Sequence, residues 1–87
     1  MTNDTLQRLK AKLDEHHGFP CPYTFKFIVP KGKAGEMEEI LQGFEFTTRQ
    51  SRTGKYVSYT AEIEMESSDT VIAIYRAAAC IEGLIAL

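Results

Sequence analysis

The side chains that could do chemistry in this sequence are few and lie far apart. The adjacent pair His16 and His17 comes first, because histidine serves both as a general base and as a metal ligand. Neighbouring residues on a helix point about 100° apart, so such a pair does not readily chelate one ion. No cysteine or carboxylate cluster with zinc spacing follows them. The pattern indicates a solvated helix end and predicts no metal site.

Nucleophiles are present, but none has a base beside it. Catalysis of this kind needs the two side chains within hydrogen-bond reach, and the two histidines precede the predicted core. Ser51, Ser58 and Cys80 are therefore not expected to be activated. Glu62 and Glu64 share one strand face about 7 Å apart, on a wet surface that is poorly suited to acid–base work. We predict no catalytic residue, no cofactor and no enzymatic activity.

A glycine loop, Gly32-Lys33-Ala34-Gly35, raises the question of a phosphate site. A P-loop places Lys and then Ser or Thr directly after its last glycine, at the start of a helix. Here Gly35 is followed by three nearby glutamates, Glu36, Glu38 and Glu39, whose charge would repel a phosphate. A P-loop is not expected.

The composition is that of one small globular domain. Ten Lys and Arg stand against twelve Asp and Glu, for a formal net charge of −2. The basic residues are scattered, which disfavours a nucleic-acid partner. No apolar run approaches the roughly 20 residues of a membrane span, and the polar N-terminus lacks the apolar centre of a secretory signal. Cys21 and Cys80 form no C-x-x-C pair, so we expect thiols. A cytoplasmic protein is expected.

The elements follow from apolar spacing. Helical spacing predicts helices over 4–15, 34–42 and about 68–80, the last capped by Ser67 to Asp69. Period-two alternation predicts strands over 23–29, 44–50, 55–65 and 84–87. Phe44 and Phe46 are expected to point inward on the second strand. A turn with Gly54 in a positive-φ conformation joins the second and third strands.

The order after the leading helix is β-α-β-β-α-β, with one apolar face on each strand. The predicted fold class is therefore α+β, a ferredoxin-like sandwich: a four-stranded antiparallel sheet, two helices on one of its faces, and an added N-terminal helix. We expect residues 1–18 to form a helical extension and residues 19–87 the ferredoxin-like domain.

Several stretches resemble the YbeD-like family of bacterial domains of unknown function. The resemblance covers about residues 19–87. It is carried by Phe19-Pro20, Phe25-Lys26, the segment Ser51-x-x-Gly54-Lys55-Tyr56-x-Ser58-x-Thr60, Ile74-Tyr75 and the hydrophobic end at Leu87.

This resemblance implies a ferredoxin-like fold similar to ACT-type regulatory domains, which bind small ligands and form oligomers. It implies no enzymatic activity. ACT-like domains hold ligands in the loop between the first strand and the next helix, which makes Lys31 and Gly32 candidates for contact with a small metabolite or a partner. The function it implies is a non-enzymatic regulatory or interaction module.

Two alternatives stay open. Lys26, Arg49 and Tyr56 form a modest basic and aromatic patch on the predicted open sheet face, where a weak single-stranded RNA binder would place such residues. A homodimer or a protein partner is the other possibility. It would cover that open face, or it would join the leucine seam of the first helix (Leu6, Leu9, Leu13) to the bland side of the last helix (Ala73, Ala77, Cys80). The seam and that side of the last helix could equally meet within one chain.

Overall fold

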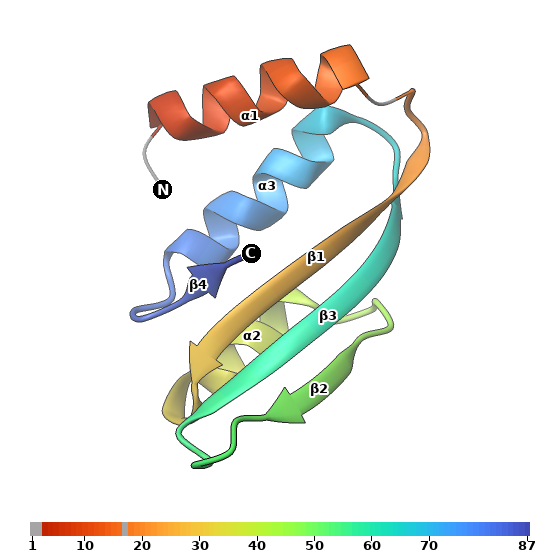
Figure 1. Ribbon diagram of the computed structural model, residues 1–87. Coiled ribbons are helices and arrows are strands. Elements are labelled where there is room, and N and C mark those ends of the chain that lie inside the picture. Colours follow the sequence, from red (N-terminus) through yellow and green to blue (C-terminus); the bar gives the residue numbers. More distant parts are fainter. Residues whose placement is uncertain (1–2, 17) are drawn as a thin grey trace.

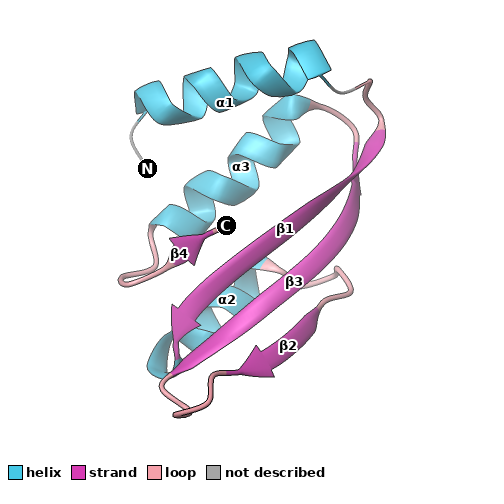
Figure 2. Cartoon of the chain, in the orientation of Figure 1, coloured by secondary structure: helices cyan, strands magenta, loops and turns pink. Residues whose placement is uncertain are grey.

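The computed structural model of the chain describes residues 3–16 and 18–87, with side chains from Thr5 onward. His17 lies outside the described residues. The elements run in the order α1 (Asn3–His16), β1 (Cys21–Pro30), the short 3-10 helix η1 (Lys31–Lys33), α2 (Ala34–Ile40), β2 (Thr47–Gln50), β3 (Tyr56–Met65), α3 (Ser68–Ala79) and β4 (Ile85–Ala86) (Figures 1 and 2).

The sheet has the spatial order β2-β3-β1-β4, and every neighbouring pair is antiparallel. Because β1 and β2 both run antiparallel to β3, they are parallel to each other with β3 between them. In the same way β1 lies between β3 and β4. Each βαβ unit is thus split by a strand of the other. The predicted α+β class, with its four-stranded antiparallel sheet, is confirmed.

The centre of the molecule is the long β1–β3 ribbon, paired over ten residues from Cys21 opposite Met65 to Pro30 opposite Tyr56. Its inner face carries the alternating apolar residues that the sequence predicted, among them Phe27 and Tyr59, which lie directly opposite each other. The Tyr59 ring reaches α2 and Phe27 contacts Tyr75 of α3. Both helices therefore cover this one face, behind the sheet in the view of Figure 1.

The leading helix α1 packs across α3 (Figure 1). Its leucine seam is buried there, with Leu6 and Leu13 both 3% exposed, and Ile72 of α3 is buried in the same core. The seam therefore packs within the chain on the side of α3 that carries Ser68 and Ile72. The side that was expected to meet it, Ala73, Ala77 and Cys80, stays exposed.

The second strand is shorter than predicted and starts later. β2 holds only Thr47–Gln50, so the expectation that Phe44 points inward from a strand is wrong. After α2 the chain turns at Gly43, with φ 89°, and the Phe44 amide still bonds the Leu41 carbonyl. Phe44 is left 40% exposed, whereas Phe46 packs on Tyr59.

Smaller differences concern the last elements. The predicted strand 84–87 pairs as a strand only at Ile85–Ala86, although the Leu87 amide continues the bonding to the Lys26 carbonyl. The predicted helix 34–42 ends at Ile40. The turn before β3 is confirmed, with Gly54 at φ 73° and its amide bonded to the Ser51 carbonyl.

Candidate functional site

The surface of the sheet that faces away from α2 and α3 is called the open face below, and Figure 1 views the sheet from this side. It consists of the side chains that alternate with the core residues. The strand register places on it Thr24, Lys26, Ile28 and Pro30 of β1, Tyr56, Ser58, Thr60, Glu62 and Glu64 of β3, Thr47 and Arg49 of β2, and Ile85 of β4.

Three of the five predicted site residues lie on the open face. Arg49 is opposite Ser58, and Ser58 is opposite Ile28, so these side chains form one row across three strands. Arg49 and Tyr56 line a shallow hollow of about 490 Å³ with Ile28 as its apolar wall; Gln50, Ser51, Arg52 and Ser58 complete it. Lys26 sits in the next row, opposite Thr60, and is not part of the hollow.

The other two, Lys31 and Gly32, lie in η1, where β1 ends. Both are exposed. The Lys31 amide donates a 2.9 Å hydrogen bond to the Lys55 carbonyl, so the first loop adjoins the start of β3. The structure therefore brings Lys31 and Gly32 to the same end of the sheet as Arg49 and Tyr56, without placing them in the hollow.

Charge is distributed unevenly along the sheet. The end where β1 stops and β3 begins carries Arg52 and Lys55 beside the turn and Lys31 in η1, with Arg49 on the open face in the row of Ser58; these four residues are called the basic end below. The other end of β3 carries Glu62 and Glu64, here called the acidic end. Lys33 at the basic end is paired with Glu36, 3.4 Å away. The rows of Ser58 and Thr60 lie between the turn and the acidic end, and they carry Arg49 and Lys26.

Apolar side chains also gather here. Of the four large hydrophobic residues that are exposed among those described, Tyr56 and Ile85 lie on the open face, 44% and 50% exposed. Leu87 follows two residues after Ile85, so it falls on the same side, and it is 63% exposed. Half-buried Ile28 is directly opposite Ile85. A face with this much exposed apolar surface is typical of a contact surface.

The candidate nucleophiles make ordinary structural bonds. Ser58 Oγ donates to the Arg49 carbonyl at 3.2 Å, Ser51 Oγ accepts from the Tyr56 amide at 3.1 Å, and Cys80 Sγ donates to the Arg76 carbonyl at 3.6 Å. Cys21 and Cys80 are thiols. His16 is exposed at the end of α1. Within residues 3–16 and 18–87, no group of three His, Cys, Asp or Glu residues could hold a metal ion.

Two buried tyrosines have perturbed titration for structural reasons. Burial, together with the bond from its hydroxyl to Glu38 Oε2 at 2.8 Å, raises the pKa of Tyr59 to about 12. Burial also raises the pKa of Tyr75, and its hydroxyl lies 3.0 Å from that of Tyr23. Both hydroxyls stay protonated near neutral pH, so they act as fixed hydrogen-bonding groups.

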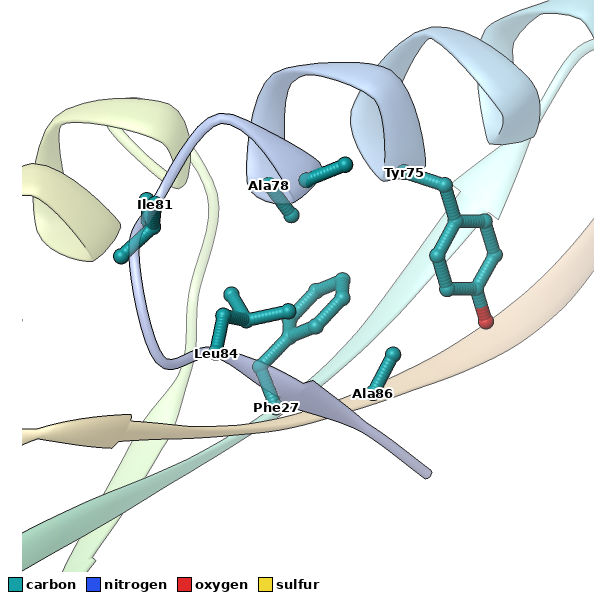
Figure 3. A pocket seen from close by; sticks show the side chains of 7 residues that line it. Phe27, Tyr75, Ala78, Ile81, Leu84 and Ala86 are labelled. Carbon is teal, nitrogen blue, oxygen red and sulfur yellow. The ribbon is translucent and has the colours of Figure 1, made fainter. Parts of the chain in front are cut away.

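A cavity of about 200 Å³, which no sequence pattern predicted, lies between the end of α3 and β4 (Figure 3). It is lined by Phe27, Tyr75, Ala78, Ala79, Ile81, Leu84 and Ala86, none of them charged. The Tyr75 hydroxyl is the one side-chain oxygen among them. The alanines leave the space because they are too small to fill the gap beside the two-residue strand, and a run of small residues is a weak sequence signal.

The family described as "Protein of unknown function (DUF493)" matches residues 14–86, which include every strand, α2 and α3. The chain belongs to the DUF493 family. This agrees with the YbeD-like resemblance seen in the residues and confirms it.

One curated relative supports the DUF493 assignment. A "UPF0250 protein" of Shewanella sediminis (strain HAW-EB3) is 29% identical over 83 residues, covering 87% of this chain and 94% of that protein. No solved structure matches the chain. Most of α1 lies outside the part that the DUF493 family matches. None of the described helices is long and apolar enough to cross a membrane.

Proposed function

We propose that this protein is a non-enzymatic interaction module that acts through the open face of its sheet. The observation that carries the proposal is the gathering of exposed apolar and basic side chains on one uncovered surface: Tyr56, Ile85 and Leu87 beside Lys26 and Arg49. A hydrophobic centre with a charged rim is the usual composition of a protein contact surface. The cytoplasm is the expected compartment, since both cysteines are thiols.

A regulatory role, in the manner of ACT-like domains, would add a small ligand. The hollow beside Arg49 and Tyr56 is the place for it, since a guanidinium binds carboxylate or phosphate in two-point geometry and a phenol ring stacks on flat groups. Ile28 offers an apolar wall. The fitting ligand class is a small organic anion with a flat apolar part.

Weak binding of single-stranded RNA is the second candidate. It is favoured by Tyr56, which is 44% exposed for stacking, and by Lys26 and Arg49 on the same face. Against it stand Glu62 and Glu64 on the same strand, which would repel the phosphate backbone. RNA could use only the basic end.

The test is an amide chemical-shift titration of the full chain. The probes are phenyl phosphate, inorganic phosphate and a ten-nucleotide oligouridylate. Small-ligand binding predicts shifts at Arg49, Tyr56 and Ser58 with phenyl phosphate that exceed those with inorganic phosphate. RNA binding predicts shifts with the oligonucleotide that weaken steeply with salt.

Two variants localise the response. Tyr56→Ala and Arg49→Ala should abolish it, whereas Arg8→Ala on α1 should leave it unchanged, because Arg8 is exposed far from the sheet. If neither probe shifts the open face and purified chain shows no self-association through it, the proposed function is wrong.

A further inference from the structure

We infer that the partner of the open face is a second copy of this chain, packed sheet on sheet about a twofold axis that crosses the strands. This rests on the proposed use of the open face and names its occupant. The argument has three parts: the charge pattern, the position of the apolar side chains, and the area available.

The charge pattern selects the orientation. A twofold axis parallel to the strands would place the basic end of one copy over the basic end of the other, and like charges repel. A twofold axis that lies in the interface and runs perpendicular to the strands reverses the strand direction of the second copy relative to the first. It then brings the turn that carries Arg52 and Lys55 towards the other copy's Glu62 and Glu64. Arg49 comes to lie over the other copy's row of Thr60, next to the row of Glu62. Of these two ways of packing the faces, the charges favour only the second.

The positions of the exposed apolar side chains fit the same arrangement of the two copies. An axis that passes between the row of Ser58 and the row of Thr60 exchanges these two rows. Ile28 and Ile85 belong to the first row, and Leu87, bonded to Lys26, falls beside the second. Each copy would therefore cover its neighbour's exposed isoleucine with a leucine. A two-layer contact of this kind is isologous, because the same patch serves both copies.

The area of the open face limits how strongly two copies can bind each other. The β1–β3 ribbon, with ten paired residues, is roughly 33 Å long, but β2 adds only four residues and β4 only two. At about 4.8 Å per strand each copy can bury roughly 400 Å², or about 800 Å² in total, which is the size of a weak and transient contact. The pair should be concentration-dependent and salt-sensitive, since opposite charges contribute to it.

The pairing also predicts that a small ligand in the hollow competes with the second copy. An organic anion in the hollow and the acidic end of a second copy would need the same arginines. Ligand binding would then separate the pair, which is one way for a regulatory module to respond.

Sedimentation velocity on the full chain tests the pairing, over about 10 to 500 µM protein at low salt. Two charge-reversed variants are used: Arg49→Glu with Arg52→Glu at the basic end, and Glu62→Lys with Glu64→Lys at the acidic end. Each alone should raise the dissociation constant at least about tenfold. An equimolar mixture of the two should restore association, because every cross-contact is again between opposite charges.

Matched controls change the net charge by the same amount away from the sheet. Arg8→Glu with Lys12→Glu on α1, and Glu15→Lys on α1 with Glu39→Lys on α2, alter exposed residues and should leave association as it is. Circular dichroism of every variant checks that the fold is retained.

The outcomes separate this inference from the proposed function. A wild-type chain that stays monomeric at the highest concentration overturns the pairing, yet open-face shifts with phenyl phosphate or RNA would still support the proposed function. A pair that neither variant weakens, or that mixing fails to restore, also overturns the inference. Restored pairing with no probe binding would sustain the inference and exclude the small-ligand and RNA roles.

Discussion

Ser68 Oγ donates a 2.5 Å hydrogen bond to the carboxylate of Asp14 and so joins the start of α3 to the end of α1. Lys10 completes the contact, with its ammonium 3.1 Å from Asp14 and 3.4 Å from Asp69. Ser68 is buried although both acids are exposed. The leading helix is therefore attached by a polar group at one end and by its leucine seam along its length.

This contact makes the docking of α1 sensitive to acid. The bonds from Ser68 and Lys10 lower the pKa of Asp14 below its ordinary value of 3.8. A lowered pKa in the folded state means that the stabilisation is complete above the ordinary value and is lost as the pH falls below it. We expect amides of α1 to exchange faster as the pH drops below about 4, relative to those of β1 and β3.

Asp14→Asn should reproduce that loss at neutral pH and remove the acid dependence. Glu15→Gln is the control, since Glu15 is an exposed neighbour on the same helix. An Asp14→Asn protein whose α1 exchange still accelerates in acid would show that another group controls the docking.

The hydroxyl of Tyr59 fixes α2 on the sheet. It donates to Glu38 Oε2 at 2.8 Å and lies 3.4 Å from the Ala34 carbonyl. Tyr59→Phe should therefore lower the free energy of unfolding by about 1 kcal/mol at neutral pH. Tyr56→Phe, which changes an exposed ring, should have almost no effect. Urea denaturation monitored by circular dichroism measures both.

Alkaline pH should weaken the same contact. The pKa of Tyr59 is raised from 10.0 to about 12, so between these values the folded state holds a proton that the unfolded state has released. The free energy of unfolding then falls as the pH rises from 10 towards 12. Tyr59→Phe should show a smaller fall than Tyr56→Phe over this range, and equal slopes would contradict the assignment.

The parts of the fold that could be predicted are those with a strong repeating pattern. The alternation from Val57 to Met65 specified β3 and its buried face, because a one-residue shift would expose the whole set. The stripe of Val71, Tyr75 and Ala78 did the same for α3. The residues of the open face could then be predicted too, because the residues that alternate with the buried ones along a strand must point to the other face of the sheet.

Other features depend on contacts between distant segments. Phe44 has the spacing of a strand residue, but the pairing of β2 with β3 begins only at Thr47 opposite Thr60, so Phe44 stays outside the sheet. Ile72 was missed as a core residue because it lies beside Leu6 of α1, a contact between distant parts of the chain. The separation of charge into a basic and an acidic end was also missed, because Arg49 and Lys31 come together only through the strand register and the Lys31–Lys55 bond.

Gly83 determines the path from α3 into β4. Its φ is 82°, and an added Cβ would lie 2.8 Å from Pro30 Cγ. Gly83→Ala should lower the free energy of unfolding by about 1–3 kcal/mol, because the positive φ is strained for alanine and the ring of Pro30 must move. Thermal denaturation gives the comparison.

Gly35→Ala is the matched control for that substitution. Gly35 lies in α2 with no atom within 4 Å of an added Cβ. Alanine there should stabilise the protein by up to about 1 kcal/mol. Equal changes in the free energy of unfolding at Gly83 and Gly35 would show that the Pro30 contact does not cause the destabilisation at Gly83.

The last prediction concerns whether α1 is an extension of a domain that spans residues 19–87. The main helix contact of α1 is with α3, through Leu6 and Leu13. Leu13→Ala should lower the free energy of opening α1 by about 2–3 kcal/mol. If α1 is an extension, its amides lose protection while those of β1 and β3 keep theirs.

Ala11→Gly is a control that weakens helix propensity by about 1 kcal/mol without touching the seam, since Ala11 is exposed. Hydrogen exchange followed residue by residue distinguishes the two cases. A parallel loss of protection in α1 and in the β1–β3 ribbon would mean that the leading helix and the sheet unfold as one unit. In that case the boundary after residue 18 would be wrong, because the leucine seam would belong to the only cooperative core of the chain.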